Sequence, residues 1–409
     1  MLKSINQNLP LIEIDNLIDL FNQKAYSDVI RKTYLLIKKY PNNEQLFNIM
    51  GITLSTIEQY KKSIVFFKKS IKLNPNNAKS YFNIGLAYHE LINLKKAVIY
   101  YTKAIELDHL YFDPLFNMGI LNEEKGDFSL AINCYKKVIQ INPNNVDVYY
   151  NLGNIYYNQS NYLLAIKYFK FAINTDPNFL KTYFNLAAAF ERVKDFYNSI
   201  KYYKLSFLRN PKDIKALDKI RIIYNKIGKN NESIFYFKNI LKKRPICKEI
   251  LYNLAFSYKN NGEFIKAELY FNKILEIDNK HIDTYLNLGE ILCKTKSYEL
   301  GLKRFEKAVE IDKKYSNSNS LLLFYLNYAP NHSPEEIFSY YKNYGYNFSY
   351  PFKKNWQSFP VIKEQKSKLK IGYVSPDFKK HSMKGFLEPV LSNHNHDQFE
   401  IYAFAELSE

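Results

Sequence analysis

The chain has 409 residues, of which 46% are hydrophobic and 24% charged, so it is too apolar for a solvated random coil and long enough for two or three domains. Its formal net charge is +18. The first twenty residues lack a basic start followed by an apolar core, and the apolar run 321–326 is far shorter than the ~20 residues that cross a bilayer. We therefore expect no membrane partner, no secretory signal and a cytoplasmic location.

The cysteines and the charge give weaker information. Cys134, Cys247 and Cys293 have neither the pairing pattern of a disulfide framework nor a metal-ligand spacing, so we expect free thiols and no metal site. A charge of +18 suggests nucleic acid as a partner. However, the Lys and Arg residues are scattered rather than gathered in one stripe, which favours solvated helix faces over a nucleic-acid interface.

A repeat of 34 residues runs through most of the chain, and its clearest mark is proline. Six prolines share one register, with His109 and Asn279 at the two missed steps: Pro41, Pro75, Pro143, Pro177, Pro211 and Pro245. Counted from Glu44, eight units cover 44–77, 78–111, 112–145, 146–179, 180–213, 214–247, 248–281 and 282–315. A weaker unit, 10–43, precedes them in the same register.

Small and aromatic residues recur at fixed positions of each unit, where position 1 is the first residue of the unit. Position 8 is small in seven units: Gly51, Gly85, Gly119, Gly153, Ala187, Ala255 and Gly289. Position 20 is small throughout: Ser63, Ala97, Ala131, Ala165, Ser199, Ser233, Ala267 and Gly301. Position 24 is always aromatic: Phe67, Tyr101, Tyr135, Phe169, Tyr203, Phe237, Phe271 and Phe305. Small residues let two helices approach closely, so each unit is predicted to be a helical hairpin whose rings form core and whose proline ends the second helix.

This pattern closely resembles the tetratricopeptide repeat. The resemblance implies a right-handed superhelical solenoid whose concave groove is formed by the first helix of each hairpin. Unit 214–247 departs from the pattern, because Arg221 stands at the small position 8, Lys219 two residues before it, and Asn230 at position 17, which is aromatic in most units. We expect a local irregularity of the groove in this unit.

Asparagine occupies position 6 in six units, a set that we call the asparagine row: Asn83, Asn117, Asn151, Asn185, Asn253 and Asn287. A carboxamide both donates and accepts, so such a row can bind the backbone of an extended peptide without reading its side chains. The alternative is structural, since the same amides can satisfy neighbouring groups of the solenoid. Periodicity alone leaves both interpretations open.

The 34-residue period stops after Tyr315. Residues 316–328 are predicted to be a helix, Ser333 or Pro334 begins another that ends near Tyr344, and 351–370 is expected to be a basic, irregular linker. LKIGYVSPDF then predicts a strand, followed by a helix over about 381–393 and a strand at 399–405, which is the first unit of a parallel sheet. The expected divisions are 1–43, 44–315, 316–368 and 369–409.

The segment LKIGYVSPDFKKHSMKGFLEPVLSNHNHDQFEIYAFAE resembles the start of the catalytic region of the protein O-GlcNAc transferase and SPINDLY group, glycosyltransferase family 41. LLLFYLNYAPNHSPEEIFSYY before it is similar to the connector of bacterial members. The resemblance implies a mostly α protein, a tetratricopeptide-repeat superhelix followed by the first βαβ unit of a Rossmann-like glycosyltransferase lobe.

The same resemblance implies an activity. Members of the group transfer a sugar, usually N-acetylglucosamine from UDP-GlcNAc, to Ser or Thr hydroxyls of proteins, and some use GDP-fucose. It implies that the asparagine row binds acceptor proteins, and that His381 is either a base that accepts the hydroxyl proton or a contact to donor or acceptor.

Only about forty residues of the catalytic region are present, without the lobe that holds most of the nucleotide-sugar site. We therefore expect this chain to bind acceptor proteins or extended peptides, to hold no cofactor and to be inactive alone. UDP-GlcNAc is the expected donor of a longer version. The alternative hypothesis is a non-catalytic peptide-binding scaffold with a degenerate catalytic remnant.

Overall fold

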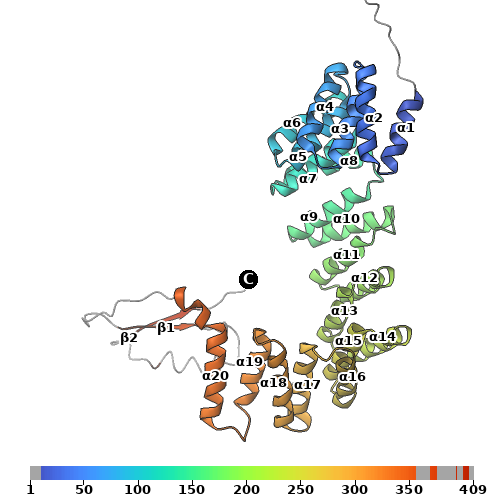
Figure 1. Cartoon of the computed structure of the whole chain (residues 1–409). Coiled ribbons are helices and arrows are strands. Elements are labelled where there is room, and N and C mark those ends of the chain that lie inside the picture. Colours follow the sequence, from blue (N-terminus) through green and yellow to red (C-terminus); the bar gives the residue numbers. More distant parts are fainter. Residues whose placement is uncertain (1–10, 356–368, 375–392, 394–398, 405–409) are drawn as a thin grey trace, which may run out of the picture. The chain divides into compact units, whose positions relative to one another are not determined.

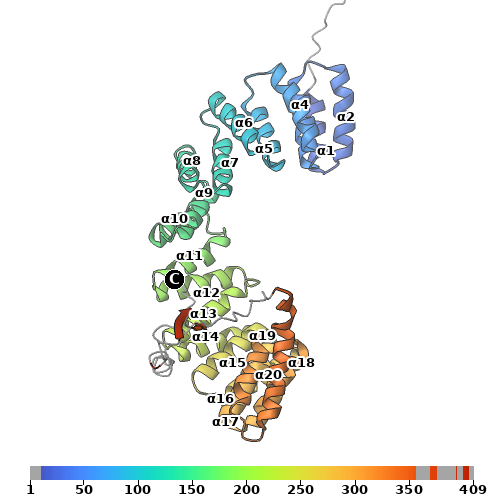
Figure 2. The same ribbon diagram turned by 90° about the vertical axis from the view of Figure 1, so that its left-hand side faces the viewer.

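The computed structural model describes residues 11–355, 369–374, 393 and 399–404. The chain forms two compact units, Met1–Ile311 and Asp312–Glu409. Nearly all of the described structure is helical, with twenty α-helices and one pair of strands. Figures 1 and 2 show the helices of the first unit following one another as antiparallel pairs, which is the organisation of a solenoid.

The first unit contains eighteen of these helices. Their bounds are α1 (Leu11–Asn22), α2 (Tyr26–Lys39), α3 (Glu44–Thr56), α4 (Tyr60–Leu73), α5 (Ala78–Glu90), α6 (Leu94–Leu107), α7 (Phe112–Glu124), α8 (Phe128–Ile141), α9 (Val146–Asn158), α10 (Tyr162–Thr175), α11 (Lys181–Arg192), α12 (Phe196–Arg209), α13 (Lys215–Lys226), α14 (Asn230–Lys243), α15 (Lys248–Asn260), α16 (Phe264–Ile277), α17 (Ile282–Thr295) and α18 (Tyr298–Ile311). Every predicted 34-residue unit contains two of them, so the helical hairpins expected from the sequence are confirmed.

Hairpins with glycine at position 8 are held closed by a contact between that glycine and the ring at position 24. A Cβ atom added to Gly51 would lie 2.5 Å from the Phe67 ring, and one added to Gly85 would lie 2.5 Å from the Tyr101 ring. The rings at position 24 are all fully buried. The two helices can therefore approach this closely only because the first helix has almost no side chain at that point.

The turn within all but the last of the nine described hairpins depends on one residue at position 15. This residue has a positive φ, between 57° and 81°, in eight hairpins: Lys24, Glu58, Ile92, Gly126, Ser160, Lys194, Gly228 and Gly262. The backbone N–H groups of this residue and of the next one donate to carbonyl groups at the end of the first helix. In the second unit, the N–H of Ile92 donates to His89 O at 2.8 Å and that of Asn93 to Tyr88 O at 2.9 Å. Glycine adopts this conformation freely, whereas the other residues do so against the strain of their Cβ.

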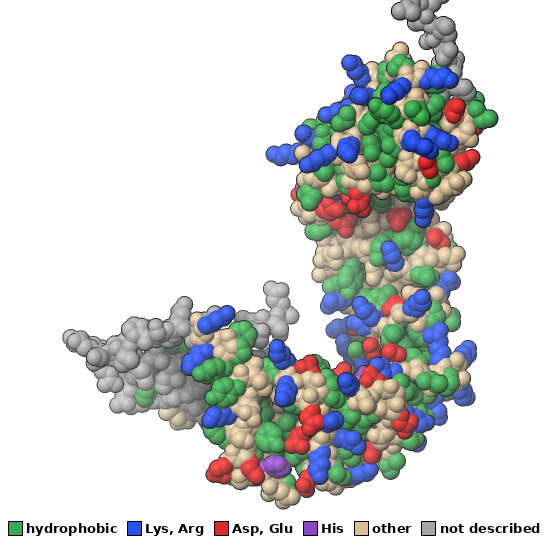
Figure 3. Space-filling view, in the orientation of Figure 1, with side chains coloured by type: hydrophobic (Ala, Val, Ile, Leu, Met, Phe, Trp, Pro, Cys, Tyr) green, Lys and Arg blue, Asp and Glu red, His purple; other side chains and the backbone are tan. Residues whose placement is uncertain are grey.

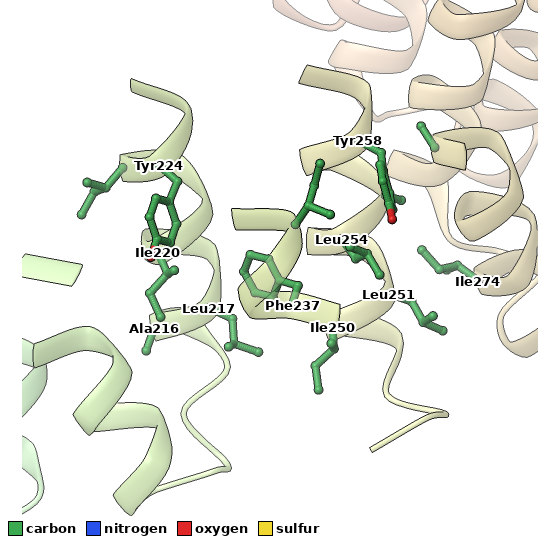
Figure 4. Close-up of a cluster of buried hydrophobic side chains, with 14 of the residues drawn as sticks. Ala216, Leu217, Ile220, Tyr224, Phe237, Ile250, Leu251, Leu254, Tyr258 and Ile274 are labelled. Carbon is green, nitrogen blue, oxygen red and sulfur yellow. The ribbon is translucent and has the colours of Figure 1, made fainter. Parts of the chain in front are cut away.

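The hairpins stack through apolar side chains that continue from one repeat to the next. Figure 4 shows Phe237 of α14 between Leu217 of α13 and Leu254 of α15. This cluster of buried residues extends from Ala187 to Ile291 and so crosses four repeats. Stability along this part of the chain is consequently shared between neighbouring hairpins.

The second unit begins with two helices that contact each other, α19 (Ser316–Leu326) and α20 (Pro334–Phe348). Ser333 caps α20 and forms a capping box with Glu336. The sequence predicts that α20 ends near Tyr344, but the helix continues to Phe348. The rings of Tyr344 and Phe348, which lie one helical turn apart, pack on each other with centroids 4.7 Å apart and so stabilise the last turn.

Two further expectations for this unit need correction. Residues Tyr350–Asn355 form a 3-10 helix, η1, rather than the start of an irregular linker, since the fixed φ of Pro351 suits a helical turn. The strands β1 (Leu369–Val374) and β2 (Phe399–Phe404) pair in parallel, with Leu369 opposite Phe399. The helix expected between them, over about 381–393, lies outside the described residues except for Asn393, which is in a turn. The βαβ unit of a Rossmann-like lobe is therefore not supported by the structure, although the two parallel strands are as predicted.

Replacement of Ile92 by glycine is expected to stabilise the solenoid. Ile92 is 83% exposed and holds φ at 57°, so it gains little from burial while its branched side chain strains the turn. We expect Ile92→Gly to raise the free energy of unfolding by about 1 kcal/mol, after the entropic cost of glycine is subtracted. Urea denaturation followed by circular dichroism measures the effect.

The matched control is Gly126→Ile, which places the same side chain at the same position of the next repeat, where φ is 81°. This variant is expected to lower the unfolding midpoint. Equal midpoints for both variants and the unmodified chain would contradict the role given to position 15.

Candidate peptide-binding face

The asparagine row lies on the first helices of the hairpins, which contact one another along the solenoid. Helix α3 contacts α5, α5 contacts α7, α9 contacts α11, α13 contacts α15 and α15 contacts α17. Position 6 of each unit therefore lies beside the preceding first helix. The structure brings the row together as a repeated feature of these helices, whereas the concave groove remains a prediction.

Three members of the row donate to position 5 of the preceding unit. The Nδ2 atom of Asn83 donates to Asn48 Oδ1 at 3.5 Å, that of Asn185 to Tyr150 OH at 3.1 Å, and that of Asn287 to Tyr252 OH at 3.1 Å. Asn48, Tyr150 and Tyr252 were not identified from the sequence. The sequence carries part of this signal, because a hydrogen-bonding residue at position 5 precedes each of these asparagines by one unit. The signal is not sufficient, since Asp218 also precedes Asn253, whose Nδ2 donates to Glu249 O instead.

Where position 5 offers no acceptor, the amide finds another one. Phe82 and Phe116 occupy that position before Asn117 and Asn151. Asn117 Nδ2 donates instead to Asp113 O within its own helix at 2.9 Å, and Asn151 Nδ2 donates to Tyr135 OH at 3.2 Å. The donor side of the row thus contributes to the solenoid itself, as the structural interpretation expected.

The acceptor side of the row differs along the chain. Among the described residues nothing donates to the Oδ1 atoms of half-buried Asn83, Asn117, Asn151 and Asn185. Asn253 and Asn287 are only 1% and 7% exposed, and their Oδ1 atoms accept from Arg221 Nε and Lys259 Nζ, both at 2.8 Å. Four asparagines therefore keep an acceptor that a ligand can use.

Tyr252 adds a donor beside this row. Burial, followed by the charge of Asp283, raises the pKa of Tyr252 to about 12, so its hydroxyl keeps its proton at neutral pH. That hydroxyl accepts from Asn287 and still has a hydrogen to donate. The face consequently presents both kinds of group that a peptide backbone needs.

The irregularity expected in unit 214–247 is present. Helices α13 and α14 pack less extensively on each other than the two helices of any other unit between 44 and 315. In turn, α13 packs more extensively on α15 than other first helices pack on the next first helix. Arg221, at the small position, projects toward α15, where its guanidinium carbon lies 4.1 Å from the centre of the Phe256 ring. Asn230 Nδ2 donates to Asn260 O at 3.2 Å, which ties α14 to the end of α15.

The remaining predicted site residue, His381, lies outside the described residues. Within the described part, no group of acidic, histidine or cysteine side chains is arranged to hold a metal ion, and the three cysteines are unpaired. In that part, too, no helix has both the length and the apolar character needed to cross a membrane. On the face shown in Figure 3, Lys and Arg are interspersed with Asp, Glu and uncharged side chains.

Family descriptions identify the repeat. The description "TPR repeat" matches residues 57–91 and 123–160, and "Tetratricopeptide repeat" matches 146–179, 78–108, 248–281 and 282–315. These segments are tetratricopeptide repeats. The matched tetratricopeptide repeats include most of the row, and the register agrees with the 34-residue units read from the sequence.

Curated relatives share a smaller part of the chain. The probable UDP-N-acetylglucosamine–peptide N-acetylglucosaminyltransferase SPINDLY of Oryza sativa subsp. japonica is 27% identical over 106 residues, which is 25% of this chain and 11% of that protein. The protein of the same name from Arabidopsis thaliana is 26% identical over 98 residues, 24% of this chain and 10% of that protein. The aligned segments thus span about a tenth of these relatives.

Solved structures are also similar to parts of this chain. The crystal structure of MamA is 26% identical, covers 39% of this chain and 93% of its own, and has a TM-score of 0.37. The C-terminal part of a TPR repeat-containing protein from Cytophaga hutchinsonii is 20% identical, covers 67% and 98%, and has a TM-score of 0.48. YrrB, described as a TPR protein with an unusual peptide-binding site, is 18% identical, covers 53% and 95%, and has a TM-score of 0.34.

Removal of Asn287 is expected to destabilise the tetratricopeptide repeats on both sides of it. Asn287 donates to Tyr252 OH and to Asp283 O, and it accepts from Lys259. Asn287→Ala removes all three of these partly buried hydrogen bonds, which costs about 1–3 kcal/mol of local stability. Native-state hydrogen exchange of the amides in α15 and α17 measures this loss.

Asn117→Ala is the matched control, since the Asn117 amide makes a single bond to its own helix. Its expected effect on exchange in α5 and α7 is smaller. Equal losses for the two variants would contradict the role of the row in joining neighbouring repeats.

Proposed function

We propose that the chain binds extended polypeptides along the asparagine row. The observation that carries the proposal is the set of four Oδ1 atoms, on Asn83, Asn117, Asn151 and Asn185, that accept nothing from the described residues. Backbone N–H groups of a peptide are suitable donors for them. Because the row makes no contact with side chains of the peptide, recognition would be broad.

The spacing of the repeats supports this mode of binding. Packed helices lie about 8–10 Å apart, and an extended chain advances about 3.3–3.6 Å per residue. One repeat then matches about three peptide residues. In the extended polyproline II conformation, which has three residues per turn, every third backbone N–H points to the same side, so such a peptide could offer one to each successive asparagine.

We propose further that this binding presents acceptor proteins for O-linked glycosyl transfer. Support comes from the partial similarity to plant proteins named as UDP-N-acetylglucosamine–peptide N-acetylglucosaminyltransferases and from the parallel pairing of β1 with β2. In this proposal UDP-GlcNAc is the donor and His381 accepts the proton of the acceptor hydroxyl or contacts a substrate. The alternative is a peptide-binding scaffold without catalysis, for which the open acceptors of the row suffice.

Removal of two open acceptors tests the binding function. We expect Asn151→Ala combined with Asn185→Ala to weaken the binding of an uncharged, extended 15-residue peptide about tenfold, because two hydrogen bonds of about 0.5–1.5 kcal/mol each are lost. Isothermal titration calorimetry measures the Kd.

Asn158→Ala is the control, because Asn158 is exposed and lies at the end of α9, away from position 6. It should leave the Kd unchanged. Unchanged affinity in the double variant would count against the row as the binding feature.

A transfer assay separates the enzyme from the scaffold. Protein isolated at its native length from its source cells is expected to add one N-acetylhexosamine to Ser or Thr of an unfolded acceptor when UDP-GlcNAc is supplied. Mass spectrometry of the acceptor detects the addition. His381→Gln should abolish the transfer of the sugar without changing the affinity for peptide. If the unmodified protein binds peptide but transfers no sugar, only the scaffold function remains.

A further inference from the structure

Arg221 of α13 is a cation that makes no ion pair within the described part of the chain. It is half-buried, its Nε donates to Asn253 Oδ1 at 2.8 Å, and its guanidinium lies on the Phe256 ring. Within the described part of the chain, neither Nη atom donates a hydrogen bond and no carboxylate lies within 4 Å. Two contacts therefore fix the direction of the side chain and leave the forked end available.

The neighbouring lysines are already paired. Lys219 Nζ lies 3.2 Å from Glu191 Oε2, and Lys259 Nζ lies 2.5 Å from Glu290 Oε2 and also donates to Asn287. Burial lowers the pKa of Arg221, an effect that the nearby Asp218 opposes without forming an ion pair. Glu191 and Glu290 pair with the lysines, and Asp218 forms no ion pair with Arg221. Among the described residues, Arg221 is therefore a positive charge without a carboxylate at ion-pair distance.

A partly buried charge is costly unless an anion or fixed hydrogen bonds compensate it. Asn253 and Phe256 supply one hydrogen bond and one cation–π contact, but neither is charged. The remaining Nη1 and Nη2 pair is the part of a guanidinium that binds a carboxylate through two parallel hydrogen bonds. Arg221 also lies against Asn253, which is itself a member of the row, so an anion bound there would belong to a ligand of this face.

We propose that Arg221 binds an acidic side chain of the polypeptide that occupies the asparagine row. This inference rests on the proposed peptide binding and adds a charge preference to it: near the repeat 214–247 the ligand carries an Asp or Glu. The single negative charge of a carboxylate matches the single positive charge of the Arg221 guanidinium. A phosphate would bring more negative charge close to Asp218, whose repulsion opposes it.

The test compares three 15-residue peptides that are identical and uncharged except at the central residue, which is Asp, Asn or phosphoserine. The full chain is titrated with each at fixed ionic strength. We expect the Asp peptide to bind about tenfold tighter than the Asn peptide, and no weaker than the phosphoserine peptide. Arg221→Met should reduce the ratio of the Asp and Asn affinities to about one.

Two further variants exclude trivial explanations. Arg244→Met removes the same charge from the end of α14, where the residue is exposed, and should keep the tenfold ratio. Arg221→Lys keeps the charge but lacks the planar fork, so it should keep only part of the ratio. Thermal denaturation shows whether each variant is folded. If Arg221→Met does not fold, Arg221→Lys takes its place in the test.

The outcomes separate this inference from the function on which it rests. Equal affinity for the Asp and Asn peptides overturns the role of Arg221 and leaves peptide binding intact, whereas no binding of any peptide overturns both. If Arg244→Met loses the preference for the Asp peptide as fully as Arg221→Met does, the preference reflects general attraction to the positively charged protein. That result also overturns the inference. Tenfold tighter binding of the phosphoserine peptide overturns the assignment of a carboxylate.

Discussion

The contact of an aromatic ring with a residue that lacks a side chain is the constraint on which the solenoid depends. Gly289 lies so close to Phe305 that a Cβ atom would be 2.5 Å from the ring, as in the pairs nearer the N-terminus. This contact sets the distance between the two helices of a hairpin. The distance in turn decides which side chains reach the preceding repeat and which remain on the face of the first helices.

The fold could be predicted from the sequence to a large extent because its determinants are local and repeated. Positions 8 and 24 lie in one hairpin, so their residue types reveal the contact without knowledge of the neighbours.

The partners of the asparagine row could not be predicted in the same way. They depend on the residue that the preceding repeat offers, which is Tyr150 for Asn185 but an aromatic ring without an acceptor for Asn117. The environment of Arg221 also depends on a neighbour, since Phe256 and Asn253 belong to the next repeat.

The structural and the peptide-binding interpretations of the row are compatible, because an amide has two ends. The Nδ2 end joins neighbouring repeats in four of the six residues and bonds to its own helix in Asn117 and Asn253. The Oδ1 end remains open in four of the six. In the last two repeats of the row both ends are occupied, and cationic side chains contact the oxygen. The character of the face therefore changes along the solenoid, from neutral acceptors to a region where charge dominates.

The arrangement of helices has a consequence for the response of the chain to mechanical load. Each repeat contacts only its neighbours, so a pulling force applied along the solenoid passes through every hairpin in series. The hairpin of α13 and α14, where Arg221 replaces the small residue, is packed least extensively among the units between 44 and 315. We therefore expect the two helices of this hairpin to separate first under tension, which would divide the repeats into two separately folded stretches.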